Sequence, residues 1–438
     1  MRGMMFGLAA MLATPAFGQG AARPAMPPIL PLRERAEVID RILKERLDTI
    51  APALLRERGV DMWVLVSREN YEEPVLASML DARSMAARRR TILVFFDPGG
   101  GKPVERLTVS RYGLGGLFAS AWAPEKQPDQ WQRLAELIAE RNPKRIAINV
   151  SPRSAYADGM TVSAYEEMMA ALPAPLRTRV VRDEAIGIRW LETRTPSEVA
   201  LYPRIVRIAH AILAEGLSNA AVTPGKTTTD DLVWWYRERI AALGLETWFH
   251  PSVAVSRRGV DRTLDGGTVI EKGDLIWTDF GIRYLRLTTD TQQNAYVLRD
   301  GETEAPKGLR DGLAASNRVQ DALTASFRVG DSGNAVLARA RAAAIAQGLT
   351  PSIYSHPLGT HGHGAGPAIG FWDNQAPDPR GADPVHPNTA WSIELSATHP
   401  VPEWGGQKIG FKTEEDAFFD GRSVRYLDGR QTELFLIR

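Results

Sequence analysis

The sequence predicts an α/β protein of two domains, and three observations lead to this prediction. A chain of 438 residues is long enough for two or three hydrophobic cores. Its first part alternates amphipathic helical patterns with short apolar runs, which is typical of an α/β domain. A helix start at Thr195-Pro196 separates this part from a second part that is richer in strands. We therefore expect an N-terminal α/β domain over residues 32–192 and a mixed α+β domain over residues 193–438.

The expected elements of the first domain follow one another in a simple order. Residues 32–57 carry apolar side chains at helical spacing, and Gly59 ends this helix. Nothing in this part indicates catalysis, so we expect it to shape a cleft and to contribute to subunit contacts. The other expected elements are strands at residues 62–66, 91–96, 107–109 and 145–150 and a helix at residues 130–140.

The second domain is expected to begin with two helices, at residues 196–218 and 228–242. Each starts at a threonine that can cap the first turn, Thr195 and Thr228. An alanine-rich helical region covers about residues 309–347 and is interrupted near Gly330. Strands are expected at residues 275–279, 294–298, 390–396, 409–419 and 433–437.

The composition excludes several classes of protein. Apolar residues make up 44% and charged residues 24% of the chain, which is typical of a globular protein. A formal net charge of +1 argues against a nucleic-acid binder, which normally carries a clear basic excess. Beyond the N-terminus no segment is apolar and long enough for a membrane span, so no membrane partner is expected. The absence of cysteine excludes disulfides, thiolate metal sites and cysteine nucleophiles.

The N-terminus has the pattern of a secretory signal peptide over residues 1–18. Arg2 supplies a positive charge, residues 4–13 are apolar, and Ala16-Phe17-Gly18 has the small-x-small pattern of a cleavage site. The apolar run is too short to cross a bilayer. A proline- and alanine-rich linker over residues 19–31 follows. We expect export to the periplasm or the medium; the alternative is an apolar N-terminal extension without defined structure.

Five residues of the second domain form the set expected to bind metal. Each has a plainer interpretation when it is taken alone: an aspartate can occupy a turn, and a glutamate can lie on the exposed face of a strand. Together, four carboxylates and one imidazole suit a pair of divalent cations, because carboxylates can bridge two ions and an imidazole cannot. Two such ions can activate water for hydrolysis. The five residues are Asp279, Asp290, His363, Glu394 and Glu414.

In these residues the chain resembles the pita-bread metallopeptidases. This family comprises methionine aminopeptidase, Xaa-Pro aminopeptidase, prolidase and creatinase-like hydrolases. Its pattern is Asp, ten residues, Asp, then a Gly-His-x-x-Gly histidine, a Glu, and a last Glu in Arg-x-Glu-(Asp/Glu). Here Gly362-His363-Gly364-Ala365-Gly366 supplies the histidine, and Glu414 is favoured over Glu415 by its offset from Lys412. The resemblance covers about residues 195–438 well and the preceding region loosely.

The resemblance implies a fold and a cofactor. It implies a creatinase-like N-terminal α/β domain, a C-terminal pita-bread catalytic domain and a homodimer. It implies that Asp279 chelates one ion, that Asp290 and Glu414 bridge two ions, and that His363 and Glu394 complete the shells. Manganese is expected, with zinc, cobalt or iron as alternatives, since all suit oxygen-rich sites with one imidazole.

Further side chains are candidates for roles around the metals. Glu394 is the expected general base, and His356 and His361 are expected to line the pocket and to shuttle protons. His250 and Lys412 are expected to contact the substrate. His399 is a weaker candidate, and His386 and His210 are assigned no role.

Four departures from the family pattern concern the residues around the substrate. Proline-specific members carry a histidine about seventeen positions before the first aspartate, where this chain has Arg262, and one seven positions after the ligand histidine, where Gly370 stands. Lys412 replaces an arginine and loses its bidentate fork. Gln292-Gln293 replaces Thr-Arg.

We therefore expect an exported dinuclear metal-dependent peptidase that hydrolyses short peptides, of the Xaa-Pro aminopeptidase or prolidase type. One alternative is a creatinase-like C–N hydrolase, which the complete set of metal ligands disfavours. The other is a non-catalytic member that binds peptides or a partner, which only the altered substrate-binding residues favour.

Overall fold

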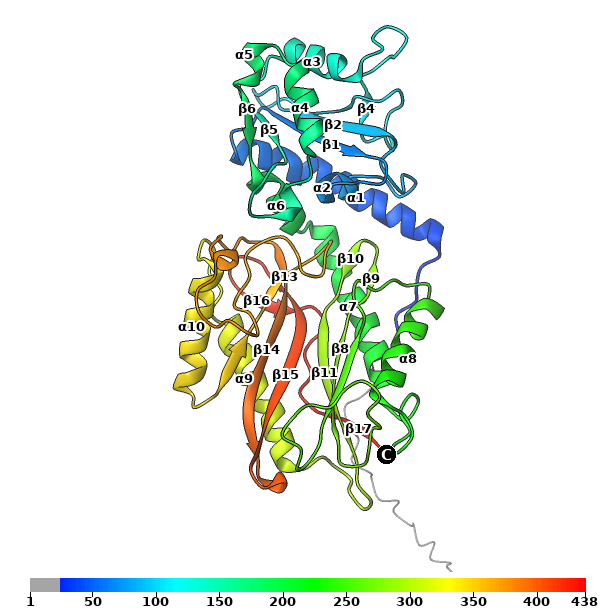
Figure 1. Cartoon of the computed structure of the whole chain (residues 1–438), viewed down its shortest axis with the longest axis vertical. Helices are drawn as coiled ribbons and strands as arrows, with labels where there is room; N and C mark the ends of the chain where they lie inside the picture. Colours follow the sequence, from blue (N-terminus) through cyan, green and yellow to red (C-terminus); the bar gives the residue numbers. More distant parts are fainter. Residues whose placement is uncertain (1–23) are drawn as a thin grey trace, which may run out of the picture.

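The structure is a computed structural model that describes residues 24–438. It consists of an upper body built on a six-stranded sheet and a lower body built on a nine-stranded sheet (Figure 1). The predicted fold class, an α/β domain followed by a mixed α+β domain, is confirmed. The predicted signal peptide, residues 1–18, and the start of the linker lie outside the described residues. Among residues 24–438, no helix is both long and apolar enough to cross a bilayer.

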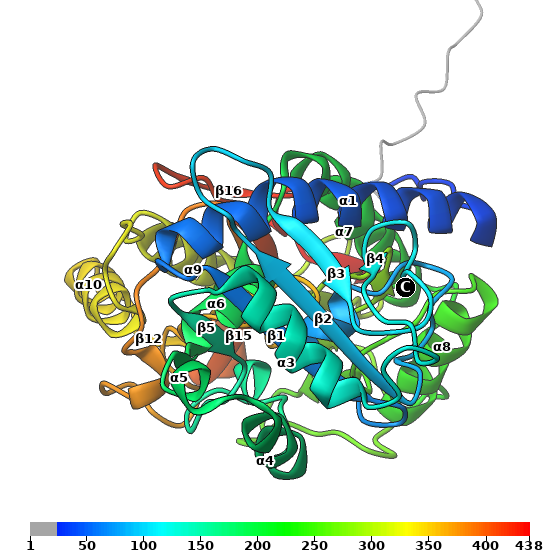
Figure 2. The ribbon, with the colours of Figure 1, turned by 90° about the horizontal axis from the view of Figure 1, so that it is seen from above.

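The N-terminal sheet separates two hydrophobic cores. Its central strand β1 (Met62–Arg68) runs antiparallel to β2 (Arg90–Phe96) and parallel to β5 (Ile146–Ile148). Trp63 and Leu65 point into a core closed by α1 (Leu32–Glu57), whereas Met62, Val64 and Val66 point into a core closed by α3 (Gln130–Arg141) and α4 (Val162–Ala171). Figure 2 shows these helices on opposite sides of the sheet.

The elements of this domain extend beyond those predicted. The strand order is β4-β3-β2-β1-β5-β6, and α1 has the predicted bounds. Short elements without a clear periodicity were not predicted, because four or five residues show too little of a pattern. The elements not yet given are α2 (Pro74–Ser78), β3 (Glu105–Thr108), β4 (Ala119–Ser120), η1 (Ala155–Ala157), α5 (Ala174–Arg177), β6 (Val180–Arg182) and α6 (Glu184–Glu192).

Buried ion pairs and hydrogen bonds join the two domains. Arg46 of α1 donates to Glu198 at the start of α7 (Pro196–Gly216), with Nη1 2.8 Å from Oε2. Glu198 also completes the capping box of Thr195, so the start of α7 is fixed to the first domain. In the hairpin of β9 (Arg283–Tyr284) and β10 (Leu287–Thr288), Arg286 donates to the Asp81 carbonyl at 3.2 Å.

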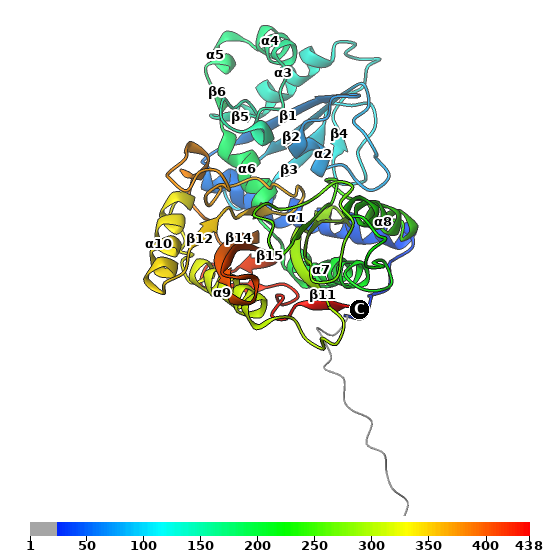
Figure 3. The ribbon, with the colours of Figure 1, turned by 60° about the horizontal axis from the view of Figure 1, so that its bottom comes forward.

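The C-terminal sheet is covered by two pairs of helices on one face. Its strand order is β12-β14-β15-β11-β8-β7, and β13, β16 and β17 join β14, β15 and β11. α7 and α8 pack against one end of the sheet and α9 and α10 against the other (Figures 1 and 3). The opposite face therefore carries polar side chains.

The elements of the second domain that follow α7 are α8 (Thr229–Ala242), β7 (Ser252–Ser256), β8 (Leu275–Phe280), β9 (Arg283–Tyr284), β10 (Leu287–Thr288), β11 (Thr291–Val297), α9 (Lys307–Thr324), α10 (Gly333–Ala346), β12 (Pro351–Ile353), β13 (His356–Leu358), η2 (Pro379–Gly381), β14 (Thr389–Val401), η3 (Pro402–Trp404), β15 (Gln407–Phe419), β16 (Val424–Tyr426) and β17 (Phe435–Ile437).

Candidate metal centre

A row of polar side chains crosses four neighbouring strands of the C-terminal sheet. Gln292 of β11 lies opposite Asp279 of β8 on one side and opposite Glu414 of β15 on the other, and Glu414 lies opposite Glu394 of β14. Directly opposed residues on adjacent strands point to the same face. Like charges in such positions repel one another. The row therefore indicates a site where a cation compensates the carboxylates.

Six side chains form this cluster, in three overlapping groups. Asp279, Asp290 and Glu414 form one group, with ligand atoms within 4.8 Å of one another. Glu414 also belongs to a group with His356 and Glu394. Asp290, His356 and His363 form the third group. The structure thus brings together all five predicted ligands, with Glu414 shared between two halves of the cluster, and adds His356.

His356, not His363, has the geometry of the ligand histidine. His356 Nε2 lies 3.6 Å from Asp290 Oδ2, 3.7 Å from Glu394 Oε2 and 3.6 Å from Glu414 Oε1. Its Nδ1 is 3.0 Å from the Pro357 carbonyl oxygen, which can only accept, so Nδ1 carries the proton and Nε2 offers a lone pair. A second hydrogen bond of this kind is usual for metal-ligating histidines.

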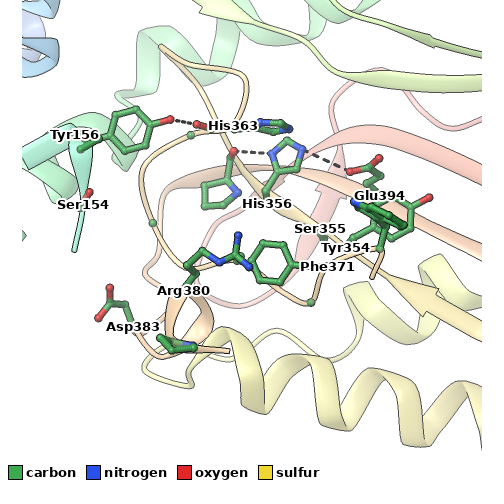
Figure 4. A pocket seen from close by; sticks show the side chains of 18 of the residues that line it. Ser154, Tyr156, Tyr354, Ser355, His356, His363, Phe371, Arg380, Asp383 and Glu394 are labelled. Carbon is green, nitrogen blue, oxygen red and sulfur yellow. Dashed lines mark hydrogen bonds and ion pairs between the residues drawn. The ribbon is translucent and has the colours of Figure 1, made fainter. Parts of the chain in front are cut away.

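His363 lies further out, at the mouth of the cavity beside the cluster. It is exposed, and its ring stands perpendicular to that of His356 with 4.7 Å between centroids (Figure 4). Both histidines belong to a group with Asp290 whose ligand atoms lie within 4.8 Å of one another. The distances to the carboxylates favour His356 over the predicted His363 as the imidazole ligand, and the segment His356-Pro357-Leu358-Gly359 also fits His-x-x-Gly. His363 then stands seven positions after the ligand, where Gly370 had indicated that the family histidine was missing.

Buried atoms without partners show that the cluster fits a cation. Asp279 Oδ1 and His356 Nε2 are buried and have no hydrogen-bond partner among the described residues. Burial and the nearby Glu414 raise the pKa of Asp279, Asp290 and Glu394 well above the usual range of carboxyl groups. A bound cation offsets both effects, because it supplies the missing partner and favours the charged carboxylates. The donor set of oxygens with one imidazole suits hard or borderline divalent ions.

The two adjacent glutamates of β15 point to opposite faces. Glu414 faces the cluster and accepts a hydrogen bond from Ser392. Glu415 accepts from Gln293 Nε2 at 3.1 Å and lies 2.8 Å from His210 Nε2. The period of two along a strand explains the difference. Glu414 therefore belongs to the cluster, as favoured from the sequence, and Glu415 supports the strand from behind.

The cluster forms the floor of a cavity of about 1000 Å³ between the two domains. Trp277, Gln292 and Lys412 line it beside the carboxylates. The wall contributed by the first domain consists of residues of η1 and α6 and their surroundings: Arg153, Ser154, Ala155, Tyr156, Glu184 and Ile188. Figure 4 shows Tyr156 reaching from this wall to His363, whose carbonyl accepts from the tyrosine hydroxyl.

The other predicted site residues differ in position. Lys412 lines the cavity, with Nζ 4.1 Å from the centre of the Trp277 ring. His361 does not line the cavity; its ring packs on the ring of Tyr156, with 4.9 Å between the centroids. Burial, together with Arg283, lowers the pKa of His361 to about 4. His250 is exposed and lies against Trp234 and Arg237, so the structure does not bring it to the cavity.

The remaining histidines lie away from the cluster. His399 packs near Phe411, with 6.5 Å between ring centres, and is not among the cavity-lining residues. His386 lies 4.0 Å from Glu192. His210 is buried behind β15. No role was assigned to His210 from the sequence, and its burial behind β15 keeps it away from the cluster.

Sequence reasoning missed two residues that touch the cluster. Gln292 was noted only as a departure from the family, although the alternation from Asp290 places it on the same face. Trp248 packs against His363, with 5.2 Å between ring centres, and lies two positions before the predicted His250. The segment that contains His250 thus contacts the cluster through Trp248.

Residues 204–418 match the model of metallopeptidase family M24. The C-terminal domain belongs to metallopeptidase family M24. The resemblance to the pita-bread metallopeptidases is thereby confirmed, as is the prediction of a metal-dependent peptide hydrolase at the level of this family.

Several solved peptidase structures share the fold of this chain. An X-Pro aminopeptidase from Thermotoga maritima aligns with a TM-score of 0.62 at 16% identity, over 88% of this chain and 99% of the other. An Xaa-Pro dipeptidase from Bacillus anthracis aligns with a TM-score of 0.56 at 15% identity, over 93% and 100%. A dipeptidase from Pyrococcus horikoshii aligns with a TM-score of 0.58 at 20% identity, over 90% and 100%. No match was found among the curated proteins.

Proposed function

We propose that this M24 protein is an exported, dinuclear metal-dependent peptidase that hydrolyses short peptides, of the Xaa-Pro aminopeptidase or prolidase type. One observation carries the proposal: the carboxylates and His356 converge on the floor of a cavity that the N-terminal domain closes on one side. Asp279, Asp290, His356, Glu394 and Glu414 would hold the ions. Bound divalent ions, with manganese expected, would activate water and polarise the scissile carbonyl.

Three side chains of the cavity have properties that suit peptide hydrolysis. Glu394 lines the cavity beside the cluster, so its carboxylate is placed to accept a proton from water and pass it to the leaving amine. Desolvation of the part of the ring that faces the protein, together with the neighbouring His356, lowers the pKa of His363, which favours a neutral imidazole beside the substrate. Lys412 keeps a positive charge beside the carboxylates, where it can bind a substrate oxygen.

The wall from the first domain supports a preference for short substrates. Arg153, Tyr156 and Ile188 line the cavity on the side opposite the C-terminal sheet. A long, folded chain would have to displace this domain to reach Glu394. Arg262 and Lys412 differ from the proline-specific pattern, so the assay compares peptides with and without proline after the scissile bond.

The test is hydrolysis by metal-free protein reloaded with Mn²⁺. The substrates are Xaa-Pro dipeptides, Xaa-Pro-Yaa tripeptides and matched peptides with alanine in place of proline. We expect cleavage that returns with Mn²⁺ and is lost in Asp279→Ala. Cleavage of the alanine peptides alone would replace the proline-specific assignment by a general peptidase. Cleavage of no member would overturn the peptidase proposal in favour of a binding role.

We also propose export and a homodimer, and each of these two properties is tested separately. The N-terminal pattern supports export, and N-terminal sequencing of protein from the periplasm or medium should then begin near residue 19. Full-length protein retained in the cytoplasm would contradict export. Light scattering after gel filtration should give the mass of a dimer, and the mass of a monomer would contradict it.

A further inference from the structure

A second row of polar side chains crosses the cavity floor beside the metal cluster. Lys412 of β15 lies opposite Ser396 of β14, and Ser396 lies opposite Ser352 of β12. Lys412 and Ser396 each stand two positions along the strand from a glutamate of the cluster, so the alternation of side chains places them on the same face as the cluster. Trp277 stands two positions from the cluster on β8 in the same way. All four side chains line the cavity.

Lys412 differs from the two arginines of the cavity because no carboxylate pairs with it. Arg153 forms an ion pair with Glu184, and Arg380 forms one with Asp378 at 3.0 Å. Among residues 24–438, no carboxylate oxygen lies within 4.0 Å of Lys412 Nζ. Its ammonium lies instead against an indole ring, 4.1 Å from the ring centre. An ammonium that is partly withdrawn from water in this way is stabilised by an anionic partner.

The metal ligands do not need Lys412 as a counterion once the site is loaded. Four carboxylates meet in the cluster, those of Asp279, Asp290, Glu394 and Glu414. Their negative charges equal the positive charges of two divalent ions. The ammonium of Lys412 is charged at neutral pH and carries three N–H donors. Its charge and donors are therefore left for a ligand in the cavity.

The row of Lys412 lies on the side of the cluster away from the first domain. β14 begins at the domain boundary, where Thr389 pairs with Thr193, and Ser396 lies further along this strand than the metal ligand of β14. His363 and the wall from the first domain lie on the opposite side, at the mouth of the cavity. A peptide chain of variable length needs the open side. The single residue before the scissile bond is then the one that lies over Lys412.

We propose that Lys412, with the hydroxyl groups of Ser352 and Ser396, forms a subsite for a carboxylate side chain, so that the preferred substrates are short peptides with an N-terminal aspartate or glutamate. The ammonium compensates the charge of the carboxylate, and the two hydroxyls can donate to its oxygens. The inference rests on the proposed function, because it names the substrate class of the same site.

The experiment compares peptides that differ only in the charge of the first side chain. The pairs are Glu-Pro-Ala-amide with Gln-Pro-Ala-amide and Glu-Ala-Ala-amide with Gln-Ala-Ala-amide, cleaved by full-length protein loaded with Mn²⁺. The C-terminal amide removes the other carboxylate of the substrate. We expect kcat/KM to be at least about tenfold higher for the glutamate member of a cleaved pair, since a hydrogen bond to a charged group contributes at least this factor.

Variants of β15 assign the preference to one ammonium. Lys412→Met removes the charge and keeps the length of the side chain, so the ratio within a pair should fall to about one, whereas Lys412→Arg keeps the charge and should keep the preference. Lys408→Met is the matched control: Lys408 is an exposed residue of the same strand outside the cavity, and its loss should leave the ratio unchanged. Mn²⁺ titration of each variant verifies that the metal site is intact.

Binding of the products measures the same preference without turnover. Calorimetry of L-glutamate and L-glutamine with the Mn²⁺-loaded wild type should show tighter binding of glutamate, and this difference should disappear in Lys412→Met. Both compounds carry the same α-amino and α-carboxylate groups, so the comparison reports on the side chain alone.

The outcomes separate this inference from the proposed function. Equal kcat/KM for both members of each pair, or a preference for glutamate that persists in Lys412→Met, would overturn the inference and leave the peptidase intact. Cleavage of no peptide would overturn the proposed function. Tighter binding of glutamate than of glutamine would then still support the subsite, and equal binding would overturn it as well.

Discussion

At the scale of single residues, the two histidines beside the cluster lead to opposite predictions. His356 Nε2 faces three carboxylates, whereas His363 stands at the mouth of the cavity. His356→Ala should weaken Mn²⁺ binding at least about tenfold, because a ligand is lost. His363→Ala should bind Mn²⁺ as the wild type does and lose turnover, by about 10²–10⁴-fold if it transfers a proton. Mn²⁺ titration and peptide hydrolysis of both variants measure this.

The opposite result would support His363 as the metal ligand, as the sequence predicts. If His363→Ala lost metal affinity and His356→Ala retained it, the Gly362-His363 segment would carry the ligand. His361→Ala serves as control, since this ring packs on Tyr156 outside the cavity and should change metal affinity little.

The sequence could place two histidines near the metal ligands, but it could not determine which of them is the ligand. Both His356 and His363 are followed three positions later by a glycine, so the motif fits either. Their roles depend on β13, which pairs with β14 so that His356 lies opposite Ser392, two positions before Glu394. That register is a long-range contact, and the local pattern contains no information on it.

Another residue-scale prediction concerns His210, which supports β15 from behind. Burial lowers its pKa, but Glu415 and Asp428 outweigh this effect and raise it to about 10. A raised folded-state pKa gives stability that is complete below the unfolded value of about 6.5 and is lost as the pH rises toward 10. His210→Gln should therefore cost about 1.5–3 kcal/mol at pH 6.5 and much less near pH 10.

Urea unfolding of metal-free wild type and variant at pH 6.5, 8 and 9.5 measures this difference. His250→Gln is the control, because His250 is exposed on the surface and its substitution should cost little at each pH. A loss of stability in His210→Gln that stays constant from pH 6.5 to 9.5 would show that the charge of the imidazole is not involved.

At the scale of elements, the loop between β13 and η2 depends on a close approach at Gly362. A Cβ at this position would lie 2.1 Å from the Trp248 ring. Trp248 cannot easily move, because its Nε1 donates to the Thr289 carbonyl at 2.9 Å, next to Asp290. Gly362→Ala should therefore destabilise the protein by about 1–3 kcal/mol and lower turnover, since the loop carries His363.

Thermal unfolding and peptide hydrolysis measure both effects of this change. Gly410→Ala is the matched control: Gly410 is an exposed residue of β15 with nothing within 4 Å of the added methyl group. We expect its stability to change by less than about 0.5 kcal/mol. Wild-type stability and turnover in Gly362→Ala would mean that the contact with Trp248 is not needed to position the loop.

The elements themselves were predictable where a pattern was long. α1 and the start of α7 have the predicted positions, because their apolar spacing and caps are local properties. β7, η1 and the strands β9 and β10 were missed, because two to five residues show no period. The order of strands in the nine-stranded sheet was not predictable either, since pairs such as β11 with β17 join segments far apart in the sequence.

At the scale of the whole molecule, the N-terminal domain contributes directly to the arrangement of the site. Tyr156 is the residue of η1 whose hydroxyl donates to the His363 carbonyl, and its ring packs on His361. The two domains are also joined by Arg46 with Glu198 and by Arg286 with the Asp81 carbonyl. Loss of the tyrosine hydroxyl alone should therefore leave the domains together and loosen only the loop that carries His363.

Tyr156→Phe should consequently lower kcat/KM and leave metal binding unchanged. One hydrogen bond contributes about 0.5–1.5 kcal/mol, so we expect a loss of up to about tenfold, mainly in kcat, because His363 and not the metal ligands is displaced. Tyr112→Phe, at a tyrosine that is 73% exposed in the same domain, should behave as the wild type. An unchanged kcat in Tyr156→Phe would mean that the N-terminal domain only encloses the cavity. A parallel loss of Mn²⁺ affinity would mean that Tyr156 also supports the metal ligands.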